Sequence, residues 1–149
     1  MRNENYLRTL YQEINMVIED EHITAIKEFE EDIKEKVNKG IIEKRQRIIG
    51  FSLTECAKNY FELYLHKKKL VDKGMNMNHR WFSSKKIAYQ KFPFEFPHKK
   101  ELLSKMVNLE KKRNLLCYGK RRARKDVEEA IKTFYEIKDL VEKEIGEIT

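Results

Sequence analysis

A cation, an amide and a phenol lie within six residues of one another: Arg113, Asn114 and Tyr118. A guanidinium suits a phosphate, or the negative charge that develops on a phosphate during RNA cleavage. The amide can orient a neighbour or donate to a phosphate oxygen. Arg113 and Tyr118 diverge on a regular helix, but they can converge where the helix ends or across a symmetric dimer. The alternative is that Arg113 and Asn114 are surface residues and that Tyr118 is a core or capping residue.

A cluster of cations surrounds these three residues. No Asp or Glu lies between Lys111 and Lys125, whereas Lys and Glu are interleaved elsewhere. A local cluster of one sign indicates phosphate binding better than the net charge of +7 does. The alternative is a solvated helix C-terminus at which the cations interact favourably with the helix dipole. Besides Arg113, the cations of the cluster are Lys111, Lys112, Lys120, Arg121, Arg122, Arg124 and Lys125.

The composition predicts one folded, helical domain. The chain has 149 residues, 38% of them charged, with only five Gly and two Pro. A positive surplus favours an acidic partner such as nucleic acid, a nucleotide or an anionic surface. No apolar run approaches membrane-spanning length, so we expect a cytoplasmic protein. Cys56 and Cys117 are expected to be reduced and partly buried, although the sequence leaves a disulfide between them open.

Apolar periodicity predicts an all-α, up-and-down bundle of four to five long helices. The N-terminal part, residues 4–39, predicts two helices, the second ending near Gly40. A third is expected from about Ile41 to Leu70. Gly50 and a capping box of Ser52 and Glu55 would divide it into two, whereas the apolar spacing continues through Gly50 and favours one helix. After it we expect a loop over 71–98, with a short helix at 84–90 and three phenylalanines packed on the bundle. A further helix is expected from His98 to Gly119. A linker over 120–125 then leads to a last helix that starts at Asp126.

Other constellations indicate less. Glu19 and His22 are too few for a metal site, so we expect neither a metal nor a cofactor. The stretch His79–Phe82 combines cations with aromatic rings, which either stack on bases or tuck Trp81 onto the core. With five scattered glycines there is no phosphate-binding glycine-rich loop.

The pattern Arg113-Asn114-x-x-x-Tyr118-Gly119, followed by a polar linker and a final amphipathic helix, resembles the HEPN family (higher eukaryotes and prokaryotes nucleotide-binding domain). The upstream aromatic-rich segment from Cys56 to Tyr64 fits as well. The resemblance covers roughly residues 41–145, with the N-terminal helices packed on that core.

The resemblance implies a helical bundle that forms homodimers, with Arg113 and Tyr118 near the dimer interface. Many members are metal-independent RNases of toxin–antitoxin or defence systems, and a nucleotidyltransferase-type protein is a common partner. By the family pattern Arg113 is the catalytic arginine and Asn114 its polar companion, but Tyr118 stands where a histidine is expected. No histidine follows Arg113 in the chain. A tyrosine is a poor base near neutral pH.

Three hypotheses follow from the sequence. The first is a HEPN-like protein, catalytically degenerate, that binds RNA or nucleotide phosphate through Arg113, Asn114 and the run from Lys120 to Lys125. The second is an active metal-independent RNase in which Tyr118 or a partner's group replaces the histidine. The third is a protein-interaction or antitoxin-like module with no nucleic-acid role.

Overall fold

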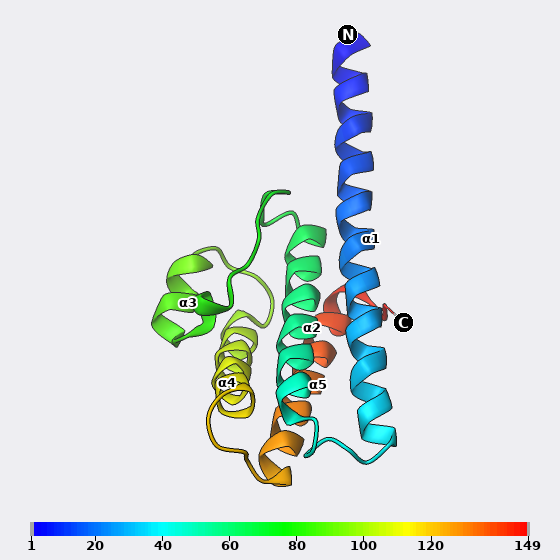
Figure 1. The fold of residues 1–149 in the computed structure, drawn as a ribbon. Helices are drawn as coiled ribbons and strands as arrows, with labels where there is room; N and C mark the ends of the chain where they lie inside the picture. Colours follow the sequence, from blue (N-terminus) through cyan, green and yellow to red (C-terminus); the bar gives the residue numbers. More distant parts are fainter. Residues whose placement is uncertain (1, 149) are drawn as a thin grey trace.

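The computed structural model describes residues 2–148 and shows an all-α bundle, as predicted (Figure 1). Four long helices pack together, and a short helical excursion joins the second to the third of them. The helices, with one 3₁₀ turn, are α1 (Arg2–Asn38), α2 (Gln46–Lys67), η1 (His79–Phe82), α3 (Lys85–Lys91), α4 (Lys99–Cys117) and α5 (Arg124–Ile145).

Helix α1 is one continuous element, so the prediction of two N-terminal helices is wrong. Nothing between Ile18 and Ile23 breaks a helix, because the connecting residues include neither Gly nor Pro. Its second half packs on α2, whereas its first half extends past the end of α2 (Figure 1). The apolar side chains of Tyr6, Leu7 and Ile14 are therefore exposed. The side chains of Tyr11 and Val17, also in the predicted stripe, lie outside the described part of the chain.

Helix α2 starts at Gln46, five residues later than predicted, because a turn occupies residues 41–45. The sequence suggested Ser52 as an N-cap, and this prediction is wrong. The Ser52 hydroxyl donates to Asp32 on α1 at 2.8 Å. Gly50 does not break the helix either. It lies where α4 comes closest, and an added Cβ would be only 2.9 Å from the sulfur of Cys117.

The loop phenylalanines pack on the bundle, as predicted. Phe92 and Phe96 are buried, with ring centroids 5.1 and 5.8 Å from that of Phe61 on α2. The Tyr64 hydroxyl donates to the Pro97 carbonyl at 2.8 Å. This aromatic cluster fixes the connection from α2 to α4, including the predicted short helix, here α3.

The last helix begins at Arg124 with Ala123 as its N-cap, so the prediction of Asp126 as the cap is wrong. Asp126 lies in the first turn, where its carboxylate interacts favourably with the positive end of the helix dipole. The apolar stripe of α5 is buried as expected. It consists of Val127, Ala130, Phe134, Ile137, Leu140 and Val141.

A buried ionic cluster joins three helices. Glu30 of α1 is only 2% exposed and accepts a hydrogen bond from the Tyr60 hydroxyl of α2. Lys138 of α5 lies 3.1 Å from the same carboxylate. Because a buried carboxylate is costly unless it is paired, this cluster fixes the mutual placement of α1, α2 and α5.

Candidate functional site at the end of helix α4

The structure brings Arg113 and Tyr118 together where α4 ends. The guanidinium carbon of Arg113 lies 5.8 Å from the centroid of the Tyr118 ring. Tyr118 is the C-cap residue, and its N–H donates to the Asn114 carbonyl at 3.3 Å. The extended backbone of Tyr118 turns its ring outward, and the residue is 61% exposed. Tyr118 is therefore not a core residue, and its ring is open to a ligand.

Arg113 has a buried partner that the sequence analysis did not identify. Its Nη1 lies 3.5 Å from Glu110 Oε1, and the arginine side chain is 11% exposed. Burial raises the pKa of Glu110, although the charges of Arg113 and His79 act in the opposite direction. Arginine has five N–H donors, so contact with Glu110 leaves donors for a phosphate.

A histidine reaches the same carboxylate from another element. His79 of η1 places its Nδ1 3.1 Å from Glu110 Oε1, although 31 residues separate the two in sequence. The His79 side chain is 48% exposed. We call the group of His79, Glu110, Arg113, Asn114 and Tyr118 the α4-end site. The sequence places His79 only in a segment that either stacks on bases or tucks Trp81 onto the core, because no local spacing links His79 to Arg113.

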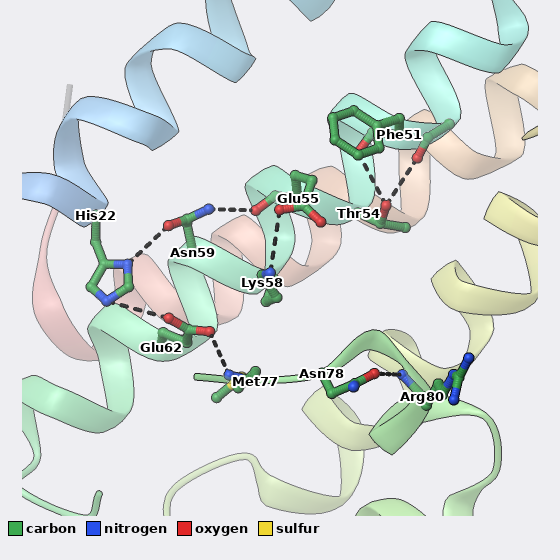
Figure 2. A network of polar contacts seen from close by, with 11 residues as sticks. His22, Phe51, Thr54, Glu55, Lys58, Asn59, Glu62, Met77, Asn78 and Arg80 are labelled. Carbon is green, nitrogen blue, oxygen red and sulfur yellow. Dashed lines mark hydrogen bonds and ion pairs between the residues drawn. The ribbon is translucent and has the colours of Figure 1, made fainter. Parts of the chain in front are cut away.

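A polar network on α2 holds the segment that carries His79 (Figure 2). The backbone N–H of Met77 donates to Glu62 Oε1 at 3.0 Å. Glu62 is in turn 3.4 Å from His22 Nε2 of α1, whose Nδ1 lies 2.9 Å from Asn59 Oδ1. These bonds attach the chain before η1 to α1 and α2, so His79 is placed by helices far from it in sequence.

The start of η1 is fixed locally. The Asn78 side chain accepts a hydrogen bond from the Arg80 N–H at 2.8 Å, which is a typical N-cap (Figure 2). A cavity of about 10 Å³ lies between His79, Glu110 and the α2 residues Thr54, Glu55 and Lys58. This volume is that of about one water molecule.

The basic cluster divides into structural and free cations. Arg121 donates to the Glu43 and Lys44 carbonyls, both at 2.8 Å, and so closes the turn before α2. The backbone N–H of Arg122 donates to the Gln46 side chain at 2.8 Å.

Two further members of the basic cluster are ion-paired. Arg124 pairs with Glu128 at 2.8 Å, and Lys112 pairs with Glu129 at 3.4 Å. Over residues 2–148, the exposed cluster members without an ion pair are Lys111, Lys120, Arg121, Arg122 and Lys125.

A groove between α4 and α5 adds cations that the sequence analysis missed. It has a volume of about 660 Å³, and Lys85 at the start of α3 borders it. Its lysines come from three helices, so only the fold reveals the group. We call it the α4–α5 groove; it is lined by Lys85, Ser104, Lys105, Val107, Asn108, Lys111, Lys112, Glu129, Lys132, Thr133 and Glu136.

Both cysteines are free thiols, and both are at least partly buried, as predicted. Burial raises the pKa of each. Cys117 donates to the Arg47 carbonyl at 3.2 Å and packs against Gly50. In the described part of the chain, no group of three or more His, Cys, Asp or Glu side chains could hold a metal ion.

The comparisons with known proteins give no relative. No protein-family model, no curated protein and no solved structure matches the chain. Between residues 2 and 148, no helix combines the length and apolarity needed to cross a membrane.

Proposed function

We propose that this chain is a HEPN-like, cytoplasmic protein that binds RNA or nucleotide phosphate at the α4-end site and the basic run after it. It would serve in a toxin–antitoxin or defence pair beside a nucleotidyltransferase-type partner. The proposal is for a binding protein, because the histidine that the family pattern places after Arg113 is absent.

One observation supports this proposal above the others: the exposed ring of Tyr118 lies against Arg113. An exposed aromatic ring can stack on any nucleobase, with a free-energy gain of about 1–3 kcal/mol per base. Lys120 and Lys125 follow it closely in the chain and are exposed. Proteins that bind single strands typically stack a base on an aromatic ring and hold the phosphate with nearby cations.

Homodimerisation is part of the proposal. The HEPN resemblance implies it, and two sets of exposed apolar side chains support it. One set is Tyr6, Leu7 and Ile14 on the projecting half of α1, and the other is Ile48 and Phe51 on α2. Exposed apolar clusters of this kind are typical of surfaces that meet another protein.

The test is fluorescence anisotropy of a labelled single-stranded RNA with wild type, Tyr118→Ala and Arg113→Ala. Both variants should weaken binding, the first through lost stacking, equivalent to about a fivefold to hundredfold loss. Tyr89→Ala is the matched control, since Tyr89 is an exposed tyrosine on α3. Equal binding by wild type and Tyr118→Ala would contradict the proposal and favour a protein-interaction module.

A second candidate is a metal-independent RNase, and His79 is the observation that favours it. A histidine whose Nδ1 contacts a carboxylate has its other nitrogen free to accept a proton, as in known acid–base pairs. Here the carboxylate is Glu110, which Arg113 also contacts. His79 would then supply the imidazole that the sequence lacks at position 118, with Arg113 stabilising charge on the phosphate.

Cleavage of labelled RNA in EDTA tests this candidate. Activity should fall about a hundredfold or more in His79→Gln, as for loss of a general base. It should also fall in Arg113→Ala, through loss of charge stabilisation on the phosphate. His98→Gln is the matched control: the His98 side chain is partly exposed, at 34% against 48% for His79, and it pairs with a glutamate, Glu144, at 3.2 Å. Intact RNA with wild type, or cleavage that survives His79→Gln, would exclude this candidate.

A further inference from the structure

The α4–α5 groove is framed by two ion pairs. Lys105 pairs with Glu136 at one end, and Lys112 pairs with Glu129 at 3.4 Å at the other. From Ser104 to Lys112 the groove runs about 12 Å along α4. Its volume of about 660 Å³ lies within the usual range for ligand sites, about 300–1,000 Å³.

The charge of the groove is unbalanced. Its lining includes five lysines and two glutamates, and the glutamates neutralise Lys105 and Lys112. The remaining three lysines are Lys85, Lys111 and Lys132, which are exposed and form no ion pair within residues 2–148. The floor adds neutral hydrogen-bonding groups from Ser104, Asn108 and Thr133.

Two other hollows of the surface lack this imbalance. One near the end of α2 is lined by Lys67 and Lys68 but also by Glu19 and Glu144, and all four side chains are ion-paired. The other lies against Trp81 and is lined by one acid, Asp72, and one lysine, Lys91. The surplus of cations is therefore a property of the α4–α5 groove and not of every depression on a lysine-rich protein.

The kinds of side chain in the groove limit what it can recognise. No Tyr, Trp, Phe, His or Arg lines it, so it offers neither a ring for a base nor a bidentate fork for one fixed phosphate. Lysines are compact charges on flexible stems and tolerate variable geometry. Spaced, mobile cations on a polar floor suit successive negative charges along a flexible chain.

We propose that the α4–α5 groove binds a chain of phosphates through Lys85, Lys111 and Lys132 without reading bases. A nucleic-acid backbone and inorganic polyphosphate share this chemistry. The site differs from the α4-end site, where Tyr118 would hold a base. Of the basic cluster, Lys111 and Lys112 line the groove, and of these two only Lys111 is free of an ion pair within residues 2–148. The inference does not rest on the proposed function.

The test measures binding of three probes: a labelled single-stranded RNA, a labelled DNA of the same sequence, and long-chain inorganic polyphosphate as competitor. The double variant Lys85→Gln/Lys132→Gln removes two free lysines but keeps good helix formers. Its matched control is Lys27→Gln/Lys143→Gln, which removes the same charge from exposed positions outside the groove. Circular dichroism confirms that each variant is folded.

The groove variant should weaken binding of all three probes. Loss of two phosphate contacts should reduce the slope of log K against log salt by about 1.4 for the nucleic acids. DNA and RNA should respond alike, since no group in the groove addresses a base. An effect no larger than that of the control pair, or no competition by polyphosphate, would overturn the proposal.

The same assay separates this site from the α4-end site. If Tyr118→Ala loses RNA binding while the groove variant behaves as its control, the groove inference is wrong and the proposed function stands. If the groove variant is weakened while Tyr118→Ala binds normally, the groove inference stands and the proposed function is wrong.

Discussion

Replacement of Gly50 by alanine tests how α2 and α4 approach each other beside the α4-end site. The new Cβ would lie 2.9 Å from Cys117 Sγ and 3.1 Å from Leu116 Cβ. Favourable contacts between such atoms are about 3.5–4.0 Å apart. Rotation of a side chain can move the sulfur, but Leu116 Cβ is attached to the α4 backbone. One of the two helices must therefore shift.

The expected cost follows from two opposing effects. Overpacking of a close contact destabilises a protein by about 1–3 kcal/mol. Alanine in place of glycine within a helix returns up to about 1 kcal/mol, and less near a helix end such as this one. The net prediction for Gly50→Ala is destabilisation by about 1 kcal/mol. Urea unfolding followed by circular dichroism measures it.

Gly74→Ala is the matched control. Gly74 lies in a loop, has no left-handed φ, and a Cβ there would meet no atom within 4 Å. Alanine should stabilise the protein there by up to about 1 kcal/mol, because it restricts the unfolded chain. The two Gly→Ala changes are thus expected to have opposite signs.

A double-mutant cycle with Cys117→Ala identifies the contact responsible. Removal of the sulfur eliminates the 2.9 Å contact, so Gly50→Ala should cost less in the Cys117→Ala background, by more than about 0.5 kcal/mol. Stabilisation by Gly50→Ala equal to that of Gly74→Ala, or strict additivity in the cycle, would refute the close approach of α2 and α4.

Three further predictions concern α1 and its contacts. Lys138→Met should cost about 2 kcal/mol in urea unfolding, because the buried Glu30 would keep only the Tyr60 hydroxyl and the exposed Lys34 as partners. A cost below about 0.5 kcal/mol, as expected for the exposed control Lys143→Met, would contradict this. Burial lowers the pKa of His66 below its usual value of 6.5, so the free energy of unfolding should be constant above pH 6.5 and decrease as the pH falls below it. In His66→Leu this decrease should be smaller. An identical pH dependence in the variant would show that His66 does not cause the decrease. Leu7→Glu should convert a dimer to a monomer in light scattering, whereas the exposed polar control Gln12→Glu should not; a wild-type monomer would remove the basis for the proposed dimer.

The sequence predicted the fold class and the buried stripe of α5, because amphipathic periodicity depends only on neighbours along the chain. It placed α4 and the short α3 within a few residues. It failed where tertiary contacts decide: Ser52 looks like a cap in sequence, yet its hydroxyl is used by Asp32. Likewise, residues 4–39 predict two helices, yet α1 runs through them without a break.

The candidate site was only partly predictable. Arg113, Asn114 and Tyr118 share one helix end, so their proximity could be anticipated from spacing. His79 reaches Glu110 only because the α2 network holds the η1 segment, and no local pattern encodes that contact. The groove lysines from α3, α4 and α5 are equally dispersed in the sequence, and among many surface lysines they carry no distinguishing signal.

The most direct test of the proposed function is the equilibrium binding of a labelled single-stranded RNA to the wild-type protein, measured over a range of salt concentrations in EDTA. The proposal predicts that log K falls as log salt rises, with a slope of about −2 or steeper, as expected for three or more phosphate contacts on a single strand. Binding that does not respond to salt, or no binding at low salt, would contradict the proposal that the basic end of this bundle holds RNA phosphates.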